Sequence, residues 1–238
     1  MAVIAVAVAS VLVAVLVLFL AYGAADISSG VYLKALCRVK TEERRVWLTF
    51  DDGPSAGETE KVLDVLKAHG AKATFFCTGR NLEENPGIAA RIAREGHGIG
   101  NHSWSHAPSF PLYGLRRMKE DVLRCSAALE KATGYGAAVF RPPFGVTNPT
   151  VARMTRDLGY SVIGWSIRTY DTVRNPDKVL GAVKSGLRPG AVILLHDRLP
   201  QCAGTLESVL ALLEREGYSF DRSIVVPDHV ERKYVTGI

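Results

Sequence analysis

Short apolar runs alternate with amphipathic stretches along residues 46–213, and this alternation is the strongest constraint on the fold. The runs are brief, and several are rich in β-branched or aromatic residues, as expected of buried strands. They occupy 46–50, 73–77, 98–100, 137–140, 161–167 and 191–195. Strands that alternate with helices usually pair in parallel. The sequence therefore predicts an α/β domain built on a mainly parallel sheet or barrel.

Apolar residues recur every three or four positions between these runs, which is typical of helices packed on one face. The longest stripe consists of Leu115, Met118, Val122, Cys125 and Leu129. Shorter stripes lie within 62–66 and 206–213, and asparagine before proline at 148–149 predicts another helix start. We assign these apolar faces to packing and not to ligand binding.

Residues 2–25 contain no charged side chain and consist mostly of Val, Ala, Leu and Ile. A helix of this length crosses a bilayer core of about 30 Å. A cleaved signal peptide is the alternative, since small residues occur at 21–25, but a basic leading region is missing and the apolar run exceeds the usual length. We therefore expect an apolar membrane anchor at 1–25, a basic linker at 26–45 and a single domain at 46–238.

Composition excludes several other classes of function. The formal net charge is +5, and the basic residues are dispersed, which argues against nucleic acid binding. The densest basic stretch, 34–45, is either a solvated linker or a contact to anionic headgroups. The four cysteines form no C-x-x-C pair, so a zinc finger or a thioredoxin-like centre is not indicated, and we predict no disulfide.

Two adjacent carboxylates, Asp51 and Asp52, directly follow the first predicted strand. An Asp-Gly-Pro turn would explain the pattern without any function. At a strand end, however, one carboxylate can bind a cation while its neighbour takes a proton from a bound water.

His102 and His106 follow the third predicted strand. Histidines four residues apart lie on one face if they belong to a helical turn, and both then offer a ring nitrogen to one metal. With Asp52 they complete two histidines and one carboxylate, a ligand set that leaves positions open for water and substrate.

Arg141, Asp171 and His196 follow the next three predicted strands, and each alone is explained equally well by a structural role. All these polar clusters nevertheless fall at the carboxyl ends of predicted parallel strands, the rim at which barrel enzymes place their chemistry. The remaining histidines, His69, His97 and His229, show no such pattern and are interpreted as structural or solvated.

The motifs at 49–54, 102–106, 141–144 and 194–197 together resemble those of the polysaccharide deacetylase family, also called the NodB-homology or carbohydrate esterase family 4 domain. The resemblance extends from Val46 to the C-terminal region. It implies a distorted (β/α) barrel that uses zinc, or another divalent metal such as Co²⁺ or Ni²⁺, to remove N-acetyl or O-acetyl groups from an acetylated oligo- or polysaccharide such as peptidoglycan.

Carried over by position, the resemblance implies that Asp51 is the general base, held by Arg141. His196 would be the general acid, tuned by Asp171. The metal ligands would be Asp52, His102 and His106. The backbone N–H of Phe144 would bind the oxyanion, with Pro143 and Leu194 on the substrate-binding surface.

Two positions depart from the family pattern. Thr172 replaces a usual tryptophan after the fourth-motif aspartate, and Phe144 stands where tyrosine is frequent. Thr172 removes an apolar wall of the acetyl pocket, which leaves the acyl and sugar preference open.

Three alternatives remain beside this interpretation. A glycan-binding pseudoenzyme would keep the fold without turnover, and a deacylase of a lipid-linked sugar would suit the apolar N-terminus. A non-haem iron oxygenase also uses two histidines and a carboxylate, but usually on an all-β scaffold. The positive-inside rule places the domain in the cytoplasm, whereas the resemblance places it outside.

Overall fold

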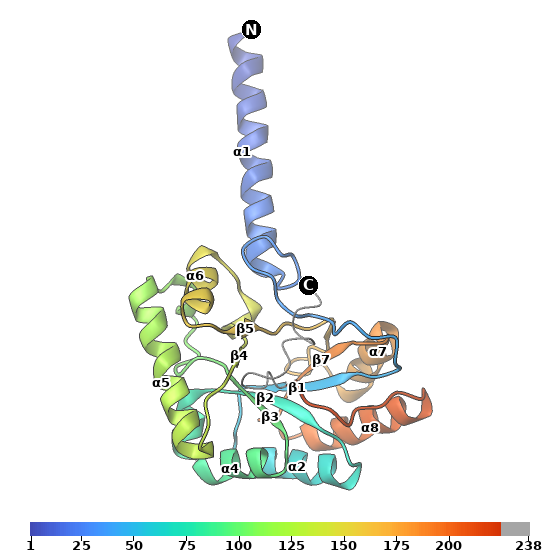
Figure 1. Ribbon diagram of the computed structural model, residues 1–238. Coiled ribbons are helices and arrows are strands. Elements are labelled where there is room, and N and C mark those ends of the chain that lie inside the picture. The colour runs from blue at the N-terminus through green and yellow to red at the C-terminus, as the bar shows by residue number, and fades with distance from the viewer. Residues whose placement is uncertain (225–238) are drawn as a thin grey trace.

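The computed structural model of the protein describes residues 1–224 and contains one seven-stranded sheet in which every strand pair is parallel. The strands are β1 (Trp47–Asp51), β2 (Ala73–Cys77), β3 (Gly98–Asn101), β4 (Val139–Phe140), β5 (Ser161–Val162), β6 (Ile167–Arg168) and β7 (Val192–His196). Their order is β5-β4-β3-β2-β1-β7-β6. The curled parallel sheet and the helices around it confirm the expected NodB-type barrel (Figure 1). His229, interpreted above as structural or solvated, lies outside the described residues.

Except between β5 and β6, helices connect successive strands and cover the outside of the sheet (Figure 1). They are α2 (Glu58–Ala68), α3 (Gly79–Glu84), α4 (Pro86–Arg94), α5 (Leu115–Thr133), α6 (Pro149–Asp157), α7 (Pro176–Gly186) and α8 (Cys202–Arg215), with short 3₁₀ turns η1 (Phe110–Leu112) and η2 (Pro143–Gly145). The expected start of α6 is confirmed, because the Asn148 side chain accepts a hydrogen bond from Val151 N at the helix N-terminus.

The single strand expected at 161–167 is wrong: it is two strands at opposite edges of the sheet. β5 pairs with β4 and β6 pairs with β7, so residues 163–166 run from one edge to the other. Gly164 lets the 26–45 segment pack closely against this crossing, since a Cβ there would collide with Cys37 Sγ. The mainly apolar stretch hides this break, because residues 161–167 are buried or half-buried throughout.

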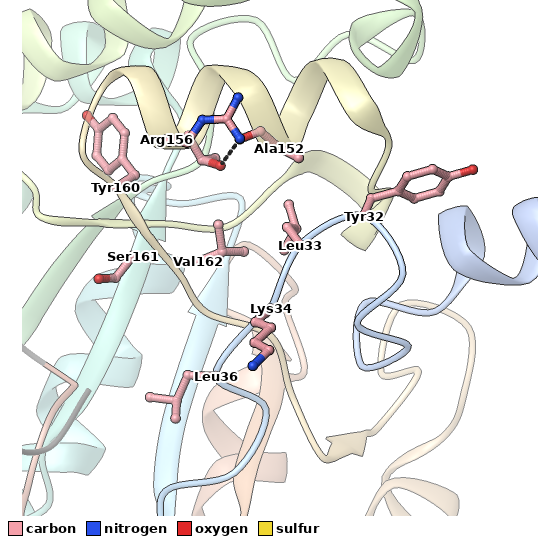
Figure 2. A pocket seen from close by; sticks show the side chains of 10 residues that line it. Tyr32, Leu33, Lys34, Leu36, Ala152, Arg156, Tyr160, Ser161 and Val162 are labelled. Atoms are coloured by element: carbon pink, nitrogen blue, oxygen red, sulfur yellow. Dashed lines mark hydrogen bonds between the residues drawn. The ribbon is translucent and has the colours of Figure 1, made fainter. Parts of the chain in front are cut away.

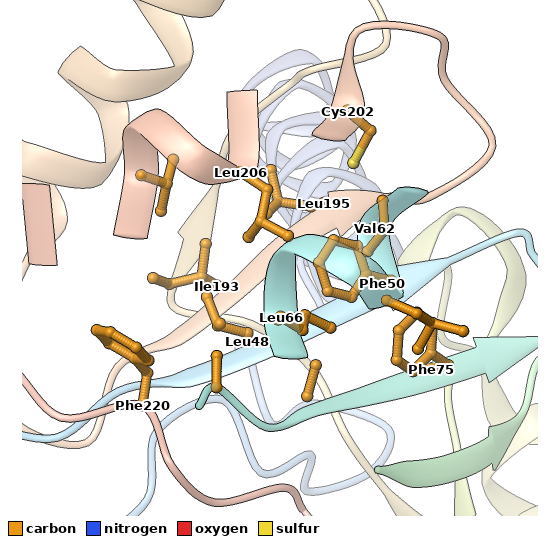
Figure 3. Packing of buried hydrophobic residues seen from close by; sticks show 14 of the residues in the cluster. Leu48, Phe50, Val62, Leu66, Phe75, Ile193, Leu195, Cys202, Leu206 and Phe220 are labelled. Carbon is orange, nitrogen blue, oxygen red and sulfur yellow. The ribbon is translucent and has the colours of Figure 1, made fainter. Parts of the chain in front are cut away.

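The main core lies between the sheet and its covering helices. Phe50 and Phe75 stack with ring centroids 5.0 Å apart, and Leu66 of α2 and Leu206 of α8 belong to the same cluster (Figure 3). The apolar stripes of α2, α5 and α8 all contribute buried residues to the interior, as expected from packing helices. The four cysteines are unpaired, and all lie within residues 1–224.

Residues 26–45, expected as a linker, lie along the domain instead of extending away from it. Ile27, Leu36 and Val39 are buried, and Leu36 forms a parallel bridge with Ile163. Figure 2 shows Leu33 beside Val162 and α6, with Leu36 farther along the same segment. The many charges of this stretch suggested solvation, but its alternate apolar side chains face the domain.

The helix α1 (Ala2–Ala25) projects from the domain (Figure 1). Its 24 residues have a mean hydropathy of 3.2 over the most apolar window, none of which is buried. Length and composition therefore suit a membrane span, although a signal sequence would have the same properties.

Because residues 26–45 contribute to the core, we expect Leu36→Ala to destabilise a protein comprising residues 26–238 by about 2–4 kcal/mol, as for other buried leucines. The matched control is Leu112→Ala, since Leu112 is 86 % exposed and its truncation should change stability by less than about 0.5 kcal/mol. Urea unfolding followed by circular dichroism measures both. Equal stabilities of the two variants would show that the segment is a passive linker.

Candidate active site

The carboxyl ends of the central strands bring the polar clusters to one rim. Asp51 at the end of β1 is in register with His196 at the end of β7. Asn101 at the end of β3 is in register with Phe140 of β4, so the next residues, His102 and Arg141, also leave the sheet side by side. The parallel sheet thus gathers residues that are far apart in the chain.

Asp52, His102 and His106 form a compact group of metal-ligating atoms. Asp52 Oδ1 lies 3.6 Å from His102 Nε2 and 3.3 Å from His106 Nε2. All three atoms lie within 4.8 Å of one another. One carboxylate oxygen and two imidazole nitrogens are ligands that zinc and related divalent ions accept.

The two histidines converge without the helical turn that was considered for 102–106. Ser103 and His106 have φ values of 65° and 45°, which a right-handed helix does not allow. Local hydrogen bonds replace helical ones: Ser103 N donates to Asn101 Oδ1, and His106 N donates to Ser103 Oγ. Asp121 Oδ1 accepts from Trp104 N at 2.7 Å and so anchors the turn to α5.

The histidines of this group are held in the form that a metal requires. His102 Nδ1 lies 2.7 Å from the Arg141 carbonyl oxygen, which can only accept, so Nδ1 carries the proton and Nε2 is left as the ligand. Burial, together with the neighbouring His102, lowers the pKa of His106 to about 4. A neutral His106 near pH 7 can therefore donate its lone pair.

Asp52 is ionised, and each of its two carboxylate oxygens lies near other polar side chains of the site. Burial opposes its ionisation, but His102, His106 and Arg198 outweigh burial, so the pKa of Asp52 lies below its usual value. Arg198 Nε donates to Asp52 Oδ2 at 2.9 Å, while Asp52 Oδ1 faces the histidines.

Asp51 is paired with a fully buried guanidinium. Arg141 Nη1 donates to Asp51 Oδ1 at 2.6 Å and to Thr49 Oγ1 at 3.0 Å. Its other donors bond to the carbonyl oxygens of Ile163 at 3.1 Å and Gly164 at 2.7 Å. Asp51 is therefore fixed through one oxygen, and its other oxygen lies 3.8 Å from His102 Nε2.

His196 is oriented by Asp171 through two hydrogen bonds. Its Nδ1 lies 2.8 Å from Asp171 Oδ1, and its backbone N–H donates to Asp171 Oδ2 at 2.7 Å. Burial alone would lower the pKa of His196, but the bond to Asp171 and the charge of Asp51 outweigh it, so this pKa lies above its usual value. Nε2 is left for a ligand, and His196 can carry a proton near neutral pH.

These groups surround a cavity of about 260 Å³. Its aromatic lining comes from Phe144, Trp165 and Tyr170, and Thr172 and Leu194 also line it. The cavity is large enough for one acylated sugar residue near the ionisable groups.

Three of the expected residues do not line this cavity. Arg141 and Asp171 are buried and reach the cavity through Asp51 and His196. Pro143 is also buried and belongs to η2, in which Phe144 adopts a left-handed conformation with φ 62°.

Sequence reasoning missed several contributors to the site. Arg198 follows the His-Asp pair of β7 by one residue, and a cation directly after a catalytic strand end was a usable signal. Asp197 is buried beneath the turn that carries Asp51 and Asp52: burial raises its pKa to about 7, and a Cβ on Gly53 would collide with its carboxylate. No local pattern marks that contact, because it joins residues far apart in sequence.

Comparison with known proteins places this geometry in a family. The profile of a family described as polysaccharide deacetylase matches residues 38–163. The peptidoglycan-N-acetylglucosamine deacetylase PgdA of Listeria monocytogenes is 39 % identical over 206 residues, covering 82 % of this chain. The chain spans only 43 % of the length of that relative.

Solved structures agree with the sequence comparison. Bacillus subtilis PdaA, described as a family 4 carbohydrate esterase, superposes with a TM-score of 0.71 at 33 % identity, over 79 % of this chain and 82 % of that one. A protein from Bacillus anthracis described as a family 4 pseudoenzyme superposes equally well, with a TM-score of 0.71 at 28 % identity, over 77 % and 65 %. Since the profile covers more than half of the chain and the motifs meet at one rim, the chain belongs to the polysaccharide deacetylase family.

Proposed function

We propose that this protein is a metal-dependent hydrolase that removes N-acetyl groups, or O-acetyl groups, from a carbohydrate. One observation carries the proposal: the Asp52, His102 and His106 group lies in one cavity with Asp51 and His196, each held by a buried partner. The Listeria relative is named for deacetylating peptidoglycan N-acetylglucosamine, and a sugar of this kind is the substrate class that we propose.

Asp52, His102 and His106 would hold Zn²⁺, or a substitute such as Co²⁺ or Ni²⁺. The donor set, the protonated Nδ1 of His102 and the neutral His106 fit such an ion. When bound, the ion would supply Lewis acidity that polarises the acetyl carbonyl and lowers the pKa of the attacking water.

The remaining steps belong to the residues of the chain. Asp51, fixed by Arg141, takes the proton of the attacking water. The Phe144 backbone N–H donates to the oxyanion that develops on the carbonyl, and Leu194 contacts the acyl group. His196, held by Asp171, donates its proton to the leaving nitrogen.

We further propose that residues 1–25 anchor the protein in a membrane and that the domain acts on the extracytoplasmic side. The apolar length of α1 supports the anchor. The extracytoplasmic side is supported by the Listeria relative, whose named substrate is peptidoglycan. The positive charges that follow the helix favour the opposite orientation under the positive-inside rule.

A pseudoenzyme is the second candidate, because a solved structure with the same fold is described as one. The base, acid and ligand positions are all present in this chain and meet in one cavity, which favours turnover. The oxygenase alternative is not retained, because its usual scaffold is all-β and this sheet is parallel with intervening helices.

The metal site is tested first. The purified protein is expected to hold about one equivalent of zinc or a substitute, and His102→Ala is expected to lose it, because a ligand is removed from a set of three. His69→Ala is the control, since His69 pairs with Glu214 at 2.9 Å and does not line the cavity. Elemental analysis after dialysis measures both. Full metal content in His102→Ala would sink the assignment.

Two substrates with different leaving groups distinguish the role of Asp51 from that of His196. An amine cannot leave as its anion near neutral pH, whereas an aryl ester releases a stable phenolate. We expect His196→Ala to slow N-deacetylation by roughly 10²–10⁴-fold while largely sparing aryl-ester cleavage. Asp51→Asn should slow both, and its amide oxygen can still accept from Arg141. Equal loss of both activities in a folded, metal-loaded His196→Ala would show that His196 is not chiefly the leaving-group acid.

The pH profile tests the pairing of His196 with Asp171. His196 must be protonated to act as an acid, so N-deacetylation should fall as the pH rises through its pKa. The hydrogen bond to Asp171 is the largest contribution that raises this pKa. Asp171→Asn is therefore expected to move the alkaline limb of kcat/KM to lower pH. An unmoved limb would mean that another group controls it.

A further inference from the structure

A second cavity of about 490 Å³ adjoins the active site, and we call it the arginine cavity. Arg38, Arg168 and Arg188 all line it. Trp165, Arg168 and Tyr170 line both this cavity and the active-site cavity, so the two share a wall. Groups bound in the two cavities would therefore lie on either side of these three side chains.

The arginine cavity carries an excess of positive charge. Within residues 1–224, none of its three guanidinium groups has a carboxylate partner within 4.0 Å. One carboxylate, Asp26, lines the cavity, and it already accepts hydrogen bonds from Ser28 N and Ser28 Oγ. Three guanidinium groups and one carboxylate, which is already hydrogen-bonded to Ser28, therefore favour an anionic ligand in this cavity.

Two of these arginines are oriented rather than freely mobile. Arg38 Nε donates to the Pro189 carbonyl oxygen at 2.7 Å. The Arg168 guanidinium lies 5.3 Å from the ring centre of Trp165 and 4.7 Å from that of Tyr170. Planar guanidinium groups held in this way suit the bidentate binding of phosphate oxygens.

The end of α1 places this cavity at the level of lipid headgroups. Ala25, the last residue of the helix, lines the cavity. The helix is 24 residues long, which corresponds to about 36 Å and is enough to cross the hydrocarbon core. Lipid phosphates lie just outside that core, beside the helix end.

The helix end is also bonded to the catalytic loop. Thr147 Oγ1 donates to the Gly23 carbonyl oxygen at 2.7 Å, and Thr147 N donates to that of Ala24 at 3.1 Å. Thr147 lies three residues after Phe144, so the loop that lines the active site is attached to the anchor. The domain is thus held against the membrane and not on a long tether.

We propose that the substrate is a lipid-linked saccharide whose phosphate binds in the arginine cavity while its acetylated sugar enters the active-site cavity. The proposal rests on the deacetylase function proposed above. In a 2-acetamido sugar bonded to phosphate at C1, the two groups stand on adjacent carbons, which matches two cavities that share a wall. The lipid would lie in the bilayer beside α1.

The test uses the full chain, purified from carbonate-washed membranes into uncharged micelles and checked for an intact N-terminus. Two substrates are compared that differ in the diphosphate between sugar and decyl chain. One is the decyl diphosphate ester of N-acetylglucosamine, and the other is the uncharged decyl glycoside of N-acetylglucosamine. Released acetate gives kcat/KM for each. We expect the diphosphate to be preferred by about tenfold or more, as for one or two charge-assisted hydrogen bonds.

The combined variant Arg38→Gln, Arg188→Gln is expected to lower this preference about tenfold. The matched control is Lys40→Gln, Lys184→Gln, which removes the same charge from exposed positions outside the lining and should leave the preference unchanged. Thermal unfolding checks that both variants are folded.

Four results would overturn the proposal. The first is a wild-type protein that shows no preference, and the second is an equal effect of both double variants, which would indicate general surface charge. The third is a chain that begins after residue 25, since the cavity would lose part of its wall. The fourth is that the double arginine variant changes cleavage of the uncharged glycoside, and does so only when phosphatidylglycerol is added. That result would show that the cavity binds bulk phospholipid. Absence of acetate from both substrates and from chitotetraose would refute the deacetylase function itself.

Discussion

The buried Arg141 guanidinium is the interaction on which the rest of the site depends. It joins β1 through Thr49 and Asp51 to the crossing segment through Ile163 and Gly164. Its own carbonyl oxygen accepts from His102 Nδ1, so one residue positions both Asp51 and His102. A guanidinium that is 0 % exposed is tolerated only because its donors are satisfied. Removing one of its partners would leave a buried, unpaired charge and would strongly destabilise the folded protein.

This dependence explains why the break in the expected strand at 161–167 matters. A single continuous strand would pair along one edge and would point its carbonyl groups at a neighbouring strand. The crossing at 163–164 instead turns two carbonyl oxygens toward Arg141. The same crossing therefore separates β5 from β6 and, through Arg141, holds Asp51 in place.

Most of the sheet and the ligand types could be predicted from the sequence, because period and strand-end position are local signals. The expected runs at 46–50, 73–77 and 191–195 match β1, β2 and β7 within one residue. The strand break at Gly164 and the conformation of His106 could not be predicted from the sequence, since both depend on contacts with distant residues. Arg198 was missed for a different reason: an exposed arginine is usually only a solvated surface residue.

The loop after β4 connects the chemistry of the site with its location. It begins at Arg141, which holds Asp51, passes through Phe144 in the cavity, and reaches Thr147, which bonds to the last turn of α1. Seven residues thus link a buried ion pair to the helix that leaves the domain. A displacement of α1 would be transmitted to this loop, because the helix carbonyl groups at Gly23 and Ala24 have their hydrogen-bond donors there. The position of α1 and the geometry of the candidate site are for this reason coupled in this chain.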